Sequence, residues 1–243
     1  MLIFLHMHKC AGSTVVRKAR KSGLQLPVPH KNGNLRTSAG KNVRYAGIGQ
    51  EEFHRLLKTQ HQNGVQFFAM EMDFPKVEYF DCGLPIELFT VVRDPWDRAV
   101  SNYRYAKLKG NARPETTFRE LMNWSYSVEG PLPRSSDYFT RKLCSADPLE
   151  KLQDSHLERA IKVLDSFRSV IVLNHDDLEE ELKTLGLVAE VKAAKRGADL
   201  HRHSLTAEQL AVSESDRVWF AEENRLDIAL LDFLRSRRAK SAK

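Results

Sequence analysis

The chain has 243 residues, of which 42% are hydrophobic and 29% charged, as in an ordinary globular protein with one sizeable core. Its net charge of +6 favours anionic partners but does not separate nucleic acid, sulfated glycan and nucleotide. Three scattered cysteines (Cys10, Cys82 and Cys144) argue against a disulfide framework and fit a reducing compartment. No segment resembles a membrane span or a signal peptide, so we expect a cytoplasmic protein, unless an upstream anchor or targeting segment was removed.

Strands and helices are expected to alternate along the chain. Apolar and β-branched runs predict strands over four segments: 2–5, 65–70, 86–92 and 169–173. Helical spacing, capping residues and breakers predict helices over these segments: 15–20, 51–62, 96–109, 114–124, 137–143, 156–167, 178–185 and 208–234. Residues 23–49 have the composition of a loop, and the basic tail from about residue 235 is expected to be frayed. The alternation predicts one α/β domain over residues 1–243, with three layers and a central parallel sheet flanked by helices.

The first fourteen residues predict a phosphate-binding loop of a P-loop-like domain. An apolar run ends in a small-residue turn, His6-Met-His-Lys-Cys-Ala-Gly-Ser-Thr14, and a helix follows. Backbone amides converge at such a turn, and the helix dipole favours negative charge there. Lys9 adds a formal charge, Gly12 would let the backbone approach the ligand closely, and Ser13 and Thr14 add hydroxyl donors. The alternative is a strand-to-helix turn in which the glycine only permits the bend.

A second polar segment follows the strand expected over 86–92. It reads Arg93-Asp-Pro-Trp-Asp-Arg-Ala-Val-Ser-Asn-Tyr103 and opens a helix at its proline. Arg93 and Ser101 could reach one anion if this helix packs back over its strand. Ligands of open parallel sheets bind beyond the carboxyl ends of the strands, which is where both segments lie. The alternative is a proline-initiated helix with a surface arginine.

Together the two segments resemble the motifs of sulfotransferases that use 3′-phosphoadenosine 5′-phosphosulfate (PAPS). Residues 6–14 are similar to their H-x-P-K-T-[AG]-G-[ST]-[ST] loop, and residues 89–103 match R-[DN]-P-x-x-R-x-x-S-x-Y at every fixed position. The branch most resembled is the carbohydrate type, which includes the glycosaminoglycan-modifying enzymes. Two residues depart from the loop motif: His8 replaces the family's proline, and Cys10 replaces its threonine, which removes one strong donor.

The resemblance implies a cofactor site with two anion-binding ends. The 5′-phosphosulfate would be held by Lys9 and the loop residues that follow it: Cys10, Ala11, Gly12, Ser13 and Thr14. Lys9 would also neutralise the charge that develops on the bridging oxygen as the sulfuryl group leaves. Arg93 and Ser101 would bind the 3′-phosphate, and Arg98 would either join them or pair structurally.

Sulfuryl transfer to an alcohol also needs a base near the acceptor hydroxyl. Glu71 is the candidate, because residues 70–80 resemble the glutamate-containing segment of some glycosaminoglycan sulfotransferases. Asp73 is a rival and His6 a more distant one, while a solvated carboxylate at the end of a strand is the structural alternative. Residues that would contact the acceptor are assigned from charge and position alone: Asp73, Lys76, Arg104, the loop over 23–49 and the segment with His201 and His203.

The sequence therefore predicts a PAPS-dependent sulfotransferase that acts on a hydroxyl-bearing acceptor, a saccharide by its resemblance, without nucleic acid as a partner. A metal site at His6, His8 and Cys10 is conceivable but not expected, because the phosphate loop already uses this segment. One alternative is a nucleotide-dependent kinase, although G-x-x-x-x-G-K-[ST] is missing. The other is a non-catalytic polyanion-binding protein, which would leave the pattern over 93–103 without a role.

Overall fold

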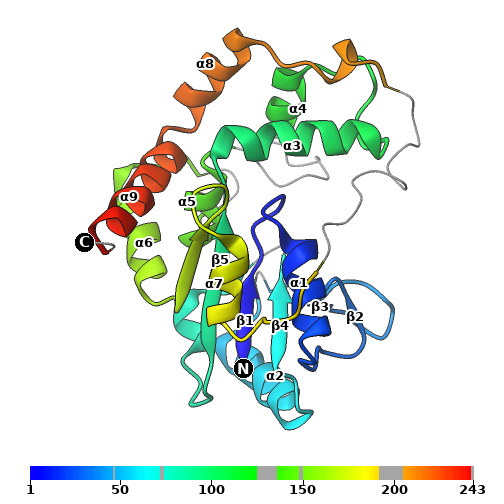
Figure 1. The fold of residues 1–243 in the computed structure, drawn as a ribbon, viewed down its shortest axis with the longest axis vertical. Helices are drawn as coiled ribbons and strands as arrows, with labels where there is room; N and C mark the ends of the chain where they lie inside the picture. Colours follow the sequence, from blue (N-terminus) through cyan, green and yellow to red (C-terminus); the bar gives the residue numbers. More distant parts are fainter. Residues whose placement is uncertain (46, 72–73, 125–135, 148–149, 192–204, 242–243) are drawn as a thin grey trace.

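A computed structural model describes residues 1–45, 47–71, 74–124, 136–147, 150–191 and 205–241. It has an α/β fold, with a six-stranded sheet flanked by helices (Figure 1). The strands are β1 (Leu2–Leu5), β2 (His30–Lys31), β3 (Asn34–Leu35), β4 (Phe67–Met70), β5 (Glu87–Val92) and β6 (Ser169–Val172), in the order β2-β3-β4-β1-β5-β6. Only β2 and β3 pair antiparallel, and every other neighbouring pair is parallel. The expected parallel sheet is thus confirmed, with two short strands added inside the expected loop.

The helices agree with the expected order. They are α1 (Gly12–Lys21), α2 (Gln50–Gln62), α3 (Pro95–Leu108), α4 (Phe118–Trp124), α5 (Tyr138–Leu143), α6 (Asp154–Asp165), α7 (Leu178–Thr184), α8 (Glu214–Glu223) and α9 (Arg225–Ser241), with short 3-10 turns η1 (Val77–Phe80) and η2 (Glu208–Leu210). The helix expected over 208–234 is divided into η2, α8 and α9. We also expected the tail from about residue 235 to be frayed, whereas α9 continues to Ser241. No helix in the described ranges is both long enough and apolar enough to cross a membrane.

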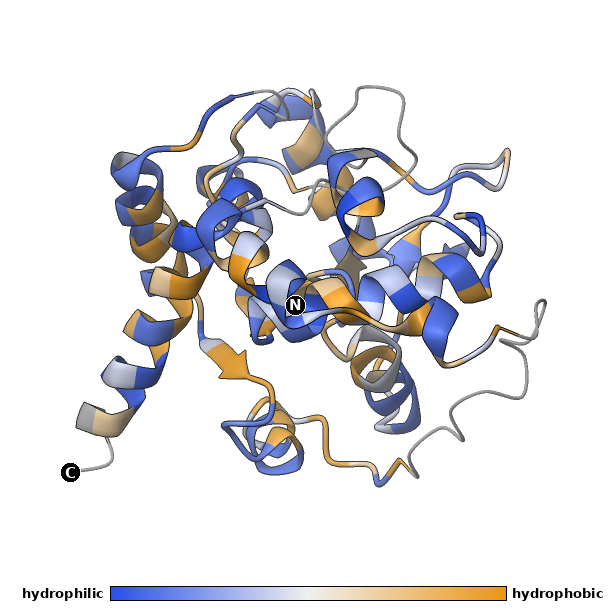
Figure 2. Ribbon diagram, turned by 90° about the horizontal axis from the view of Figure 1, so that it is seen from above, coloured by the Kyte–Doolittle hydropathy of each residue, from blue (hydrophilic) through white to orange (hydrophobic). Residues whose placement is uncertain are grey.

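The main core lies around the central strand β1. Ile3 and Phe4 are fully buried, and the Phe4 ring stacks on Phe89 of β5 with 4.8 Å between centroids. Burying each such side chain contributes about 1.5–3 kcal/mol. Figure 2 shows that the helices carry both hydrophobic and hydrophilic residues, as expected of helices that cover a sheet on one side and meet water on the other.

A second, aromatic core joins α3, α4 and α8. Phe118 of α4 packs 5.6 Å from Tyr103 of α3 and 6.1 Å from Phe220 of α8, measured between ring centroids. Figure 1 shows these three helices as an upper layer beyond the carboxyl ends of the strands. This layer holds α3 above the loop that leaves β1.

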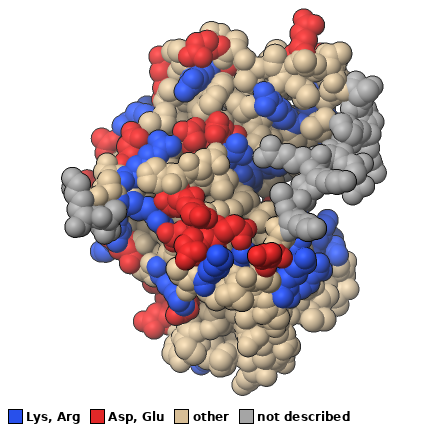
Figure 3. Space-filling model, in the orientation of Figure 1, with Lys and Arg blue, Asp and Glu red and all other residues tan. Residues whose placement is uncertain are grey.

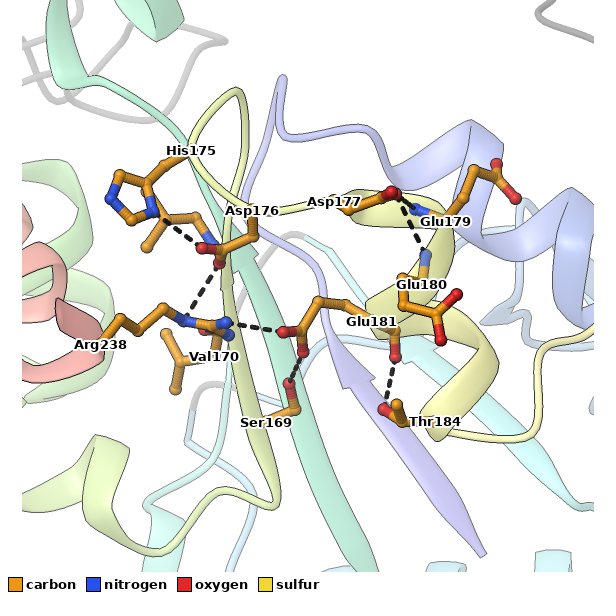
Figure 4. A network of polar contacts seen from close by, with 11 residues as sticks. Ser169, Val170, His175, Asp176, Asp177, Glu179, Glu180, Glu181, Thr184 and Arg238 are labelled. Atoms are coloured by element: carbon orange, nitrogen blue, oxygen red, sulfur yellow. Dashed lines mark hydrogen bonds and ion pairs between the residues drawn. The ribbon is translucent and has the colours of Figure 1, made fainter. Parts of the chain in front are cut away.

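The C-terminal helix α9 is tied to the edge of the sheet through Arg238 (Figure 4). The guanidinium of Arg238 donates to the Val170 carbonyl oxygen of β6 at 2.8 Å and to Glu181 of α7 at 2.6 Å. Its Nε lies 3.1 Å from Asp176, a carboxylate that is only 4% exposed and also accepts from the Val172 amide. The basic tail is therefore part of the folded domain at this position.

Two buried carboxylates join α5 to α9. Asp137 accepts hydrogen bonds from the Leu226 and Asp227 amides, and Asp227 accepts from the Phe139 and Thr140 amides. Each carboxylate thus satisfies amides at the start of the other's helix. Burial raises the pKa of both, and that of Asp227 reaches about 7.

Candidate functional site

Three neighbouring strands bring the expected site residues to one edge of the sheet. Leu5, at the end of β1, is in register with Met70 of β4 and with Thr90 of β5. Glu71, the loop after β1 and Arg93 therefore follow three adjacent strands in the order β4, β1, β5. After β1 the chain builds β3 and β4 on one side, and it later adds β5 and β6 on the other. Open parallel sheets bind ligands at such a reversal of strand order.

The loop after β1 has the backbone of an anion site. Lys9 and Ala11 adopt left-handed conformations, with φ of 66° and 56°, which turns successive amides toward a common side. Helix α1 begins directly afterwards, without a side-chain cap and without an acidic residue in its first turn. The Thr14 amide donates to the Ala11 carbonyl oxygen, so the amides of Gly12 and Ser13 are the ones that a ligand could use. Ser13 is exposed at this end of the helix, and Thr14 is half-buried.

Gly12 has a different role from the expected one. A Cβ at this position would lie 1.8 Å from His6 Nε2, so it is the imidazole of His6 that requires the glycine. His6 is 4% exposed and stacks on Phe4 at 5.1 Å. Burial lowers the pKa of His6 to about 4, which keeps the ring neutral at physiological pH. His6 thus packs beneath the loop, with no exposed face toward an acceptor.

Cys10 also points away from the loop opening. Its side chain is fully buried in the main core, and burial raises the pKa of the thiol to about 12. Its amide donates to the Met7 carbonyl oxygen at 3.1 Å, and its thiol lies 3.8 Å from the His8 carbonyl oxygen. The structure therefore places both donors of Cys10 inside the turn, where they shape the loop rather than face a ligand.

Lys9 connects the loop to α3. Its ammonium lies over the ring of Tyr105, 4.0 Å from the centroid. Such a cation–π contact contributes about 0.5–1 kcal/mol at a partly exposed site. The lysine charge thus lies between the end of β1 and α3, the helix that begins two residues after Arg93.

The helix α3 presents polar groups that lack partners in the described part of the chain. Arg98 is 1% exposed and its guanidinium stacks on Tyr138 at 4.2 Å, yet its Nε and Nη2 atoms make no hydrogen bond there. Both amide atoms of Asn102 and the Nε of Arg93 are also unpaired in these ranges. Arg93 lies 3.7 Å from Asp97, and Ser101 is half-buried on the same helix. Buried donors without a protein partner, such as those of Arg93 and Arg98, are expected to bind an anion or a water molecule. Arg98 makes no ion pair with a described carboxylate but stacks on aromatic rings, so both alternatives for it, phosphate binding and structural pairing, stay open at this point.

Glu71 has three neighbours at the end of β4: His8, Asn34 and His6, whose Nδ1 lies 3.7 Å from the carboxylate oxygen that faces His8. One carboxylate oxygen lies 3.2 Å from His8 Nδ1, and the other lies 3.5 Å from the amide nitrogen of Asn34. The Glu71 backbone amide donates to the Asn34 side-chain oxygen at 2.8 Å. Burial alone would raise the pKa of Glu71, but the hydrogen bond from His8 and the nearby imidazoles and amide outweigh it, so the pKa is lowered. The carboxylate is therefore ionised and fixed in orientation.

The other residues expected to contact an acceptor are Asp73, Lys76, Arg104, His201 and His203. Asp73, His201 and His203 lie outside the described residues. Lys76 is exposed just before η1, and Arg104 donates from its Nε to the Leu210 carbonyl oxygen at 3.4 Å, toward η2. Among the described residues, no group of three or more His, Cys, Asp or Glu side chains is arranged to hold a metal ion.

Two residues near Glu71 were not identified from the sequence. Asn34 was assigned to a loop, but it opens β3 after a two-residue turn, Asn32-Gly33, in which both residues have positive φ. An Asn-Gly pair with flanking extended residues is a strong hairpin signal and could have revealed it. His8 was considered only as a departure from a motif and as part of a conceivable metal site.

No protein-family profile matches the chain, and a search of curated proteins finds no significant match. The case for a function therefore depends on the residues and the geometry of this edge of the sheet.

Proposed function

We propose that the chain is a PAPS-dependent sulfotransferase that transfers a sulfuryl group to an acceptor hydroxyl, in particular one on a saccharide. The proposal treats the sheet edge as a P-loop-like nucleotide site. The observation that carries it is the placement of the two expected anion-binding segments after adjacent parallel strands, β1 and β5. The motif resemblance of residues 6–14 and 89–103 supports the assignment of those segments to one cofactor.

The side chains fit a nucleotide with anionic groups at both ends. The left-handed positions of the loop and the uncapped start of α1 suit the 5′ end, with Lys9 nearby. The unpaired donors of Arg93, Arg98 and Asn102 suit a phosphate at the 3′ end, because a guanidinium offers two parallel donors to an oxyanion. We assign Arg98 to this end on the strength of its unpaired atoms.

The cofactor, when bound, supplies the activated sulfuryl group. Lys9 would neutralise charge on the bridging oxygen as the bond to sulfur breaks, an effect whose removal typically reduces kcat about 100- to 1,000-fold. The aromatic face of Tyr105 would position that ammonium. The base would come from the contacting pair Glu71 and His8. Glu71 follows β4, and His8 lies in the loop after the neighbouring strand β1.

A nucleotide-dependent kinase is the first alternative. The loop after β1 has no lysine that follows its glycine, so the contact that P-loop kinases make to the β- and γ-phosphates has no counterpart in the sequence of this loop. The two-ended donor set also favours a nucleotide phosphorylated at the 3′ position over a nucleoside triphosphate.

A non-catalytic polyanion-binding protein is the second alternative. On the face shown in Figure 3, Lys and Arg side chains are interspersed with Asp and Glu rather than gathered in one basic patch. A protein that binds polyanions through charge alone needs a continuous basic stripe. This reading also gives no role to the buried, unpaired donors of α3.

The test is thermal stabilisation by 3′-phosphoadenosine 5′-phosphate, compared with ATP and with a single-stranded oligonucleotide. A ligand at about 100 times its Kd stabilises by about 2.7 kcal/mol, which is readily measured as a shift in Tm. We expect the bisphosphate shift to vanish in Arg93→Ala and to persist in Arg20→Ala, which removes the same charge from an exposed position in the last turn of α1. A shift with ATP but none with the bisphosphate would exclude the proposed function.

A further inference from the structure

We propose that His8 accepts the proton of the acceptor hydroxyl through its Nε2 atom, and that Glu71 positions the imidazole for this step. The inference rests on the proposed function and names the residue that acts as base. The sequence motif gives no reason to expect it, because the resembled loop has proline at this position.

His8 is held by two contacts of its imidazole and by one hydrogen bond of its backbone. Its Nδ1 lies 3.2 Å from a carboxylate oxygen of Glu71, and its backbone amide donates to the Tyr138 hydroxyl at 3.0 Å. The edge of the ring meets Tyr105 at 6.1 Å between centroids. Glu71 and Tyr105 therefore set the orientation of the ring, and the bond to Tyr138 holds the main chain of His8, as the positioning of a reacting group requires.

The other ring nitrogen is left without a partner. His8 Nε2 is buried and makes no hydrogen bond to any described residue. With Nδ1 donating to the ionised Glu71, the neutral ring has its lone pair on Nε2. A buried acceptor without a donor is unfavourable, and the hydroxyl of an acceptor would satisfy it.

Glu71 itself is poorly suited to take the proton. Its two oxygens already accept from His8 and Asn34, and those contacts stabilise the ionised form. A carboxylate whose pKa is lowered in this way is a weaker base than an ordinary one. The same ionised carboxylate stabilises the imidazolium that forms when the neighbouring ring is protonated.

Lys9 would then act on the leaving phosphate and His8 on the acceptor hydroxyl. Both side chains approach the Tyr105 ring, the ammonium of Lys9 at 4.0 Å and the imidazole of His8 at 6.1 Å. The acceptor oxygen forms a bond to sulfur, and the bond between sulfur and the bridging oxygen of the 5′-phosphosulfate breaks. The leaving phosphate keeps the electron pair beside Lys9, and the hydroxyl proton goes to His8 Nε2.

The kinetic test uses radiolabelled PAPS with heparosan and desulfated chondroitin as acceptors. Removal of a general base typically reduces the rate about 100- to 10,000-fold, so we expect such a loss of kcat in His8→Ala with the bisphosphate affinity retained. Added imidazole should restore part of the rate in His8→Ala and none in Glu71→Gln. His61→Ala, at an exposed histidine of α2, is the matched control and should behave as wild type. The proposal is overturned if His8→Ala keeps wild-type kcat, or if acetate rescues Glu71→Ala while imidazole leaves His8→Ala unchanged.

The second measurement needs no turnover. Long-range nitrogen–proton NMR of the labelled protein, at a pH where imidazoles are neutral, reports which nitrogen of His8 carries the proton. We expect a protonated Nδ1 and an unprotonated Nε2, and the opposite tautomer would overturn the inference. In the kinetic test, the proposed function fails if the wild-type protein transfers the radiolabelled sulfuryl group neither to an acceptor nor to water. The two failures are thus distinguishable.

Discussion

The Cα atom of Gly12 lies against the imidazole of His6, so that a Cβ at position 12 would fall 1.8 Å from His6 Nε2. His6 is 4% exposed, and its ring stacks on Phe4. The first turn of α1 is therefore positioned by contact with the side chain of His6.

The Gly12→Ala variant should be destabilised, because overpacking of this kind typically costs about 1–3 kcal/mol. It should also lose affinity for 3′-phosphoadenosine 5′-phosphate, since the start of α1 must move. Chemical denaturation and ligand-induced Tm shifts would measure both. Gly49→Ala is the control, since a Cβ there meets no atom within 4 Å. Unchanged stability in Gly12→Ala would contradict the packing argument, and Gly12→Ala combined with His6→Ala should recover much of the loss.

The Asn34→Ala variant should affect the base without affecting the cofactor. The change removes the acceptor of the Glu71 amide and one contact to its carboxylate. An unsatisfied buried amide costs about 1–3 kcal/mol, and a mobile Glu71 would no longer orient His8. We expect a lower kcat with an unchanged Kd for the bisphosphate. Asn63→Ala, at the exposed end of α2, serves as the control. A variant with reduced bisphosphate affinity and normal kcat would show that Asn34 acts elsewhere.

The Asp137–Asp227 pair should make the protein less stable as the pH rises. The pKa of Asp227 is raised from its ordinary value of 3.8 to about 7, first by burial and then by Asp137. The folded state thus holds a proton that the unfolded chain releases, so this contribution is complete below pH ~4 and is lost as the pH rises through about 7.

Urea unfolding at several pH values, compared between wild type and Asp227→Asn, would isolate this contribution. The unfolding free energy of the wild type minus that of Asp227→Asn should decrease as the pH rises across that window. Only the wild type has a carboxyl group at position 227 that titrates. His6, whose pKa is lowered to about 4, contributes the opposite slope at acid pH in both proteins and cancels in the comparison. A difference that stays constant with pH would refute the raised pKa.

The Arg238→Ala variant should loosen the C-terminal helix. It leaves the nearly buried Asp176 and the Val170 carbonyl without this partner. Loss of a partner from a buried ion pair costs about 3–5 kcal/mol, and because Arg238 is partly exposed we expect less, about 1–3 kcal/mol. Arg225→Ala is a matched control on the same helix, since its pair with Asp154 is exposed and should contribute at most about 1 kcal/mol. Equal Tm values for the two variants would contradict the anchoring role.

The longer strands could be predicted from the sequence because each is a continuous apolar run. In β5, residues 88–92 are buried on both faces, so the composition of this segment separates it from loops. The short strands β2 and β3 were missed because each has two residues, and Asn34 is buried there by the turn at Asn32-Gly33 rather than by its own hydrophobicity. The extent of α9 was missed because basic residues at the end of a chain resemble a frayed tail, whereas Arg238 is held by tertiary contacts.

At the site, residue types and order were sufficient to predict that the segments after β1 and β5 lie at the same edge of the sheet, and their binding of an anion stays a prediction. The directions of the side chains were not predictable, because they follow from the left-handed backbone at Lys9 and Ala11. That backbone sends Cys10 into the core. The contact between His8 and Glu71 joins residues 63 positions apart, and a one-dimensional pattern carries no information about such a contact.

The left-handed conformation of Lys9 and Ala11 has an evolutionary consequence. A residue other than glycine is disfavoured in this conformation by about 1–2 kcal/mol, so glycine at either position relieves that backbone cost. Selection for thermostability alone should favour Lys9→Gly less than Ala11→Gly, because Lys9→Gly also loses the contact of the ammonium with Tyr105. Only the first substitution discards an ammonium group. A thermostability screen with a parallel activity assay would then separate two mutations that are equivalent for the backbone, and it would show which of the two positions is retained for chemistry.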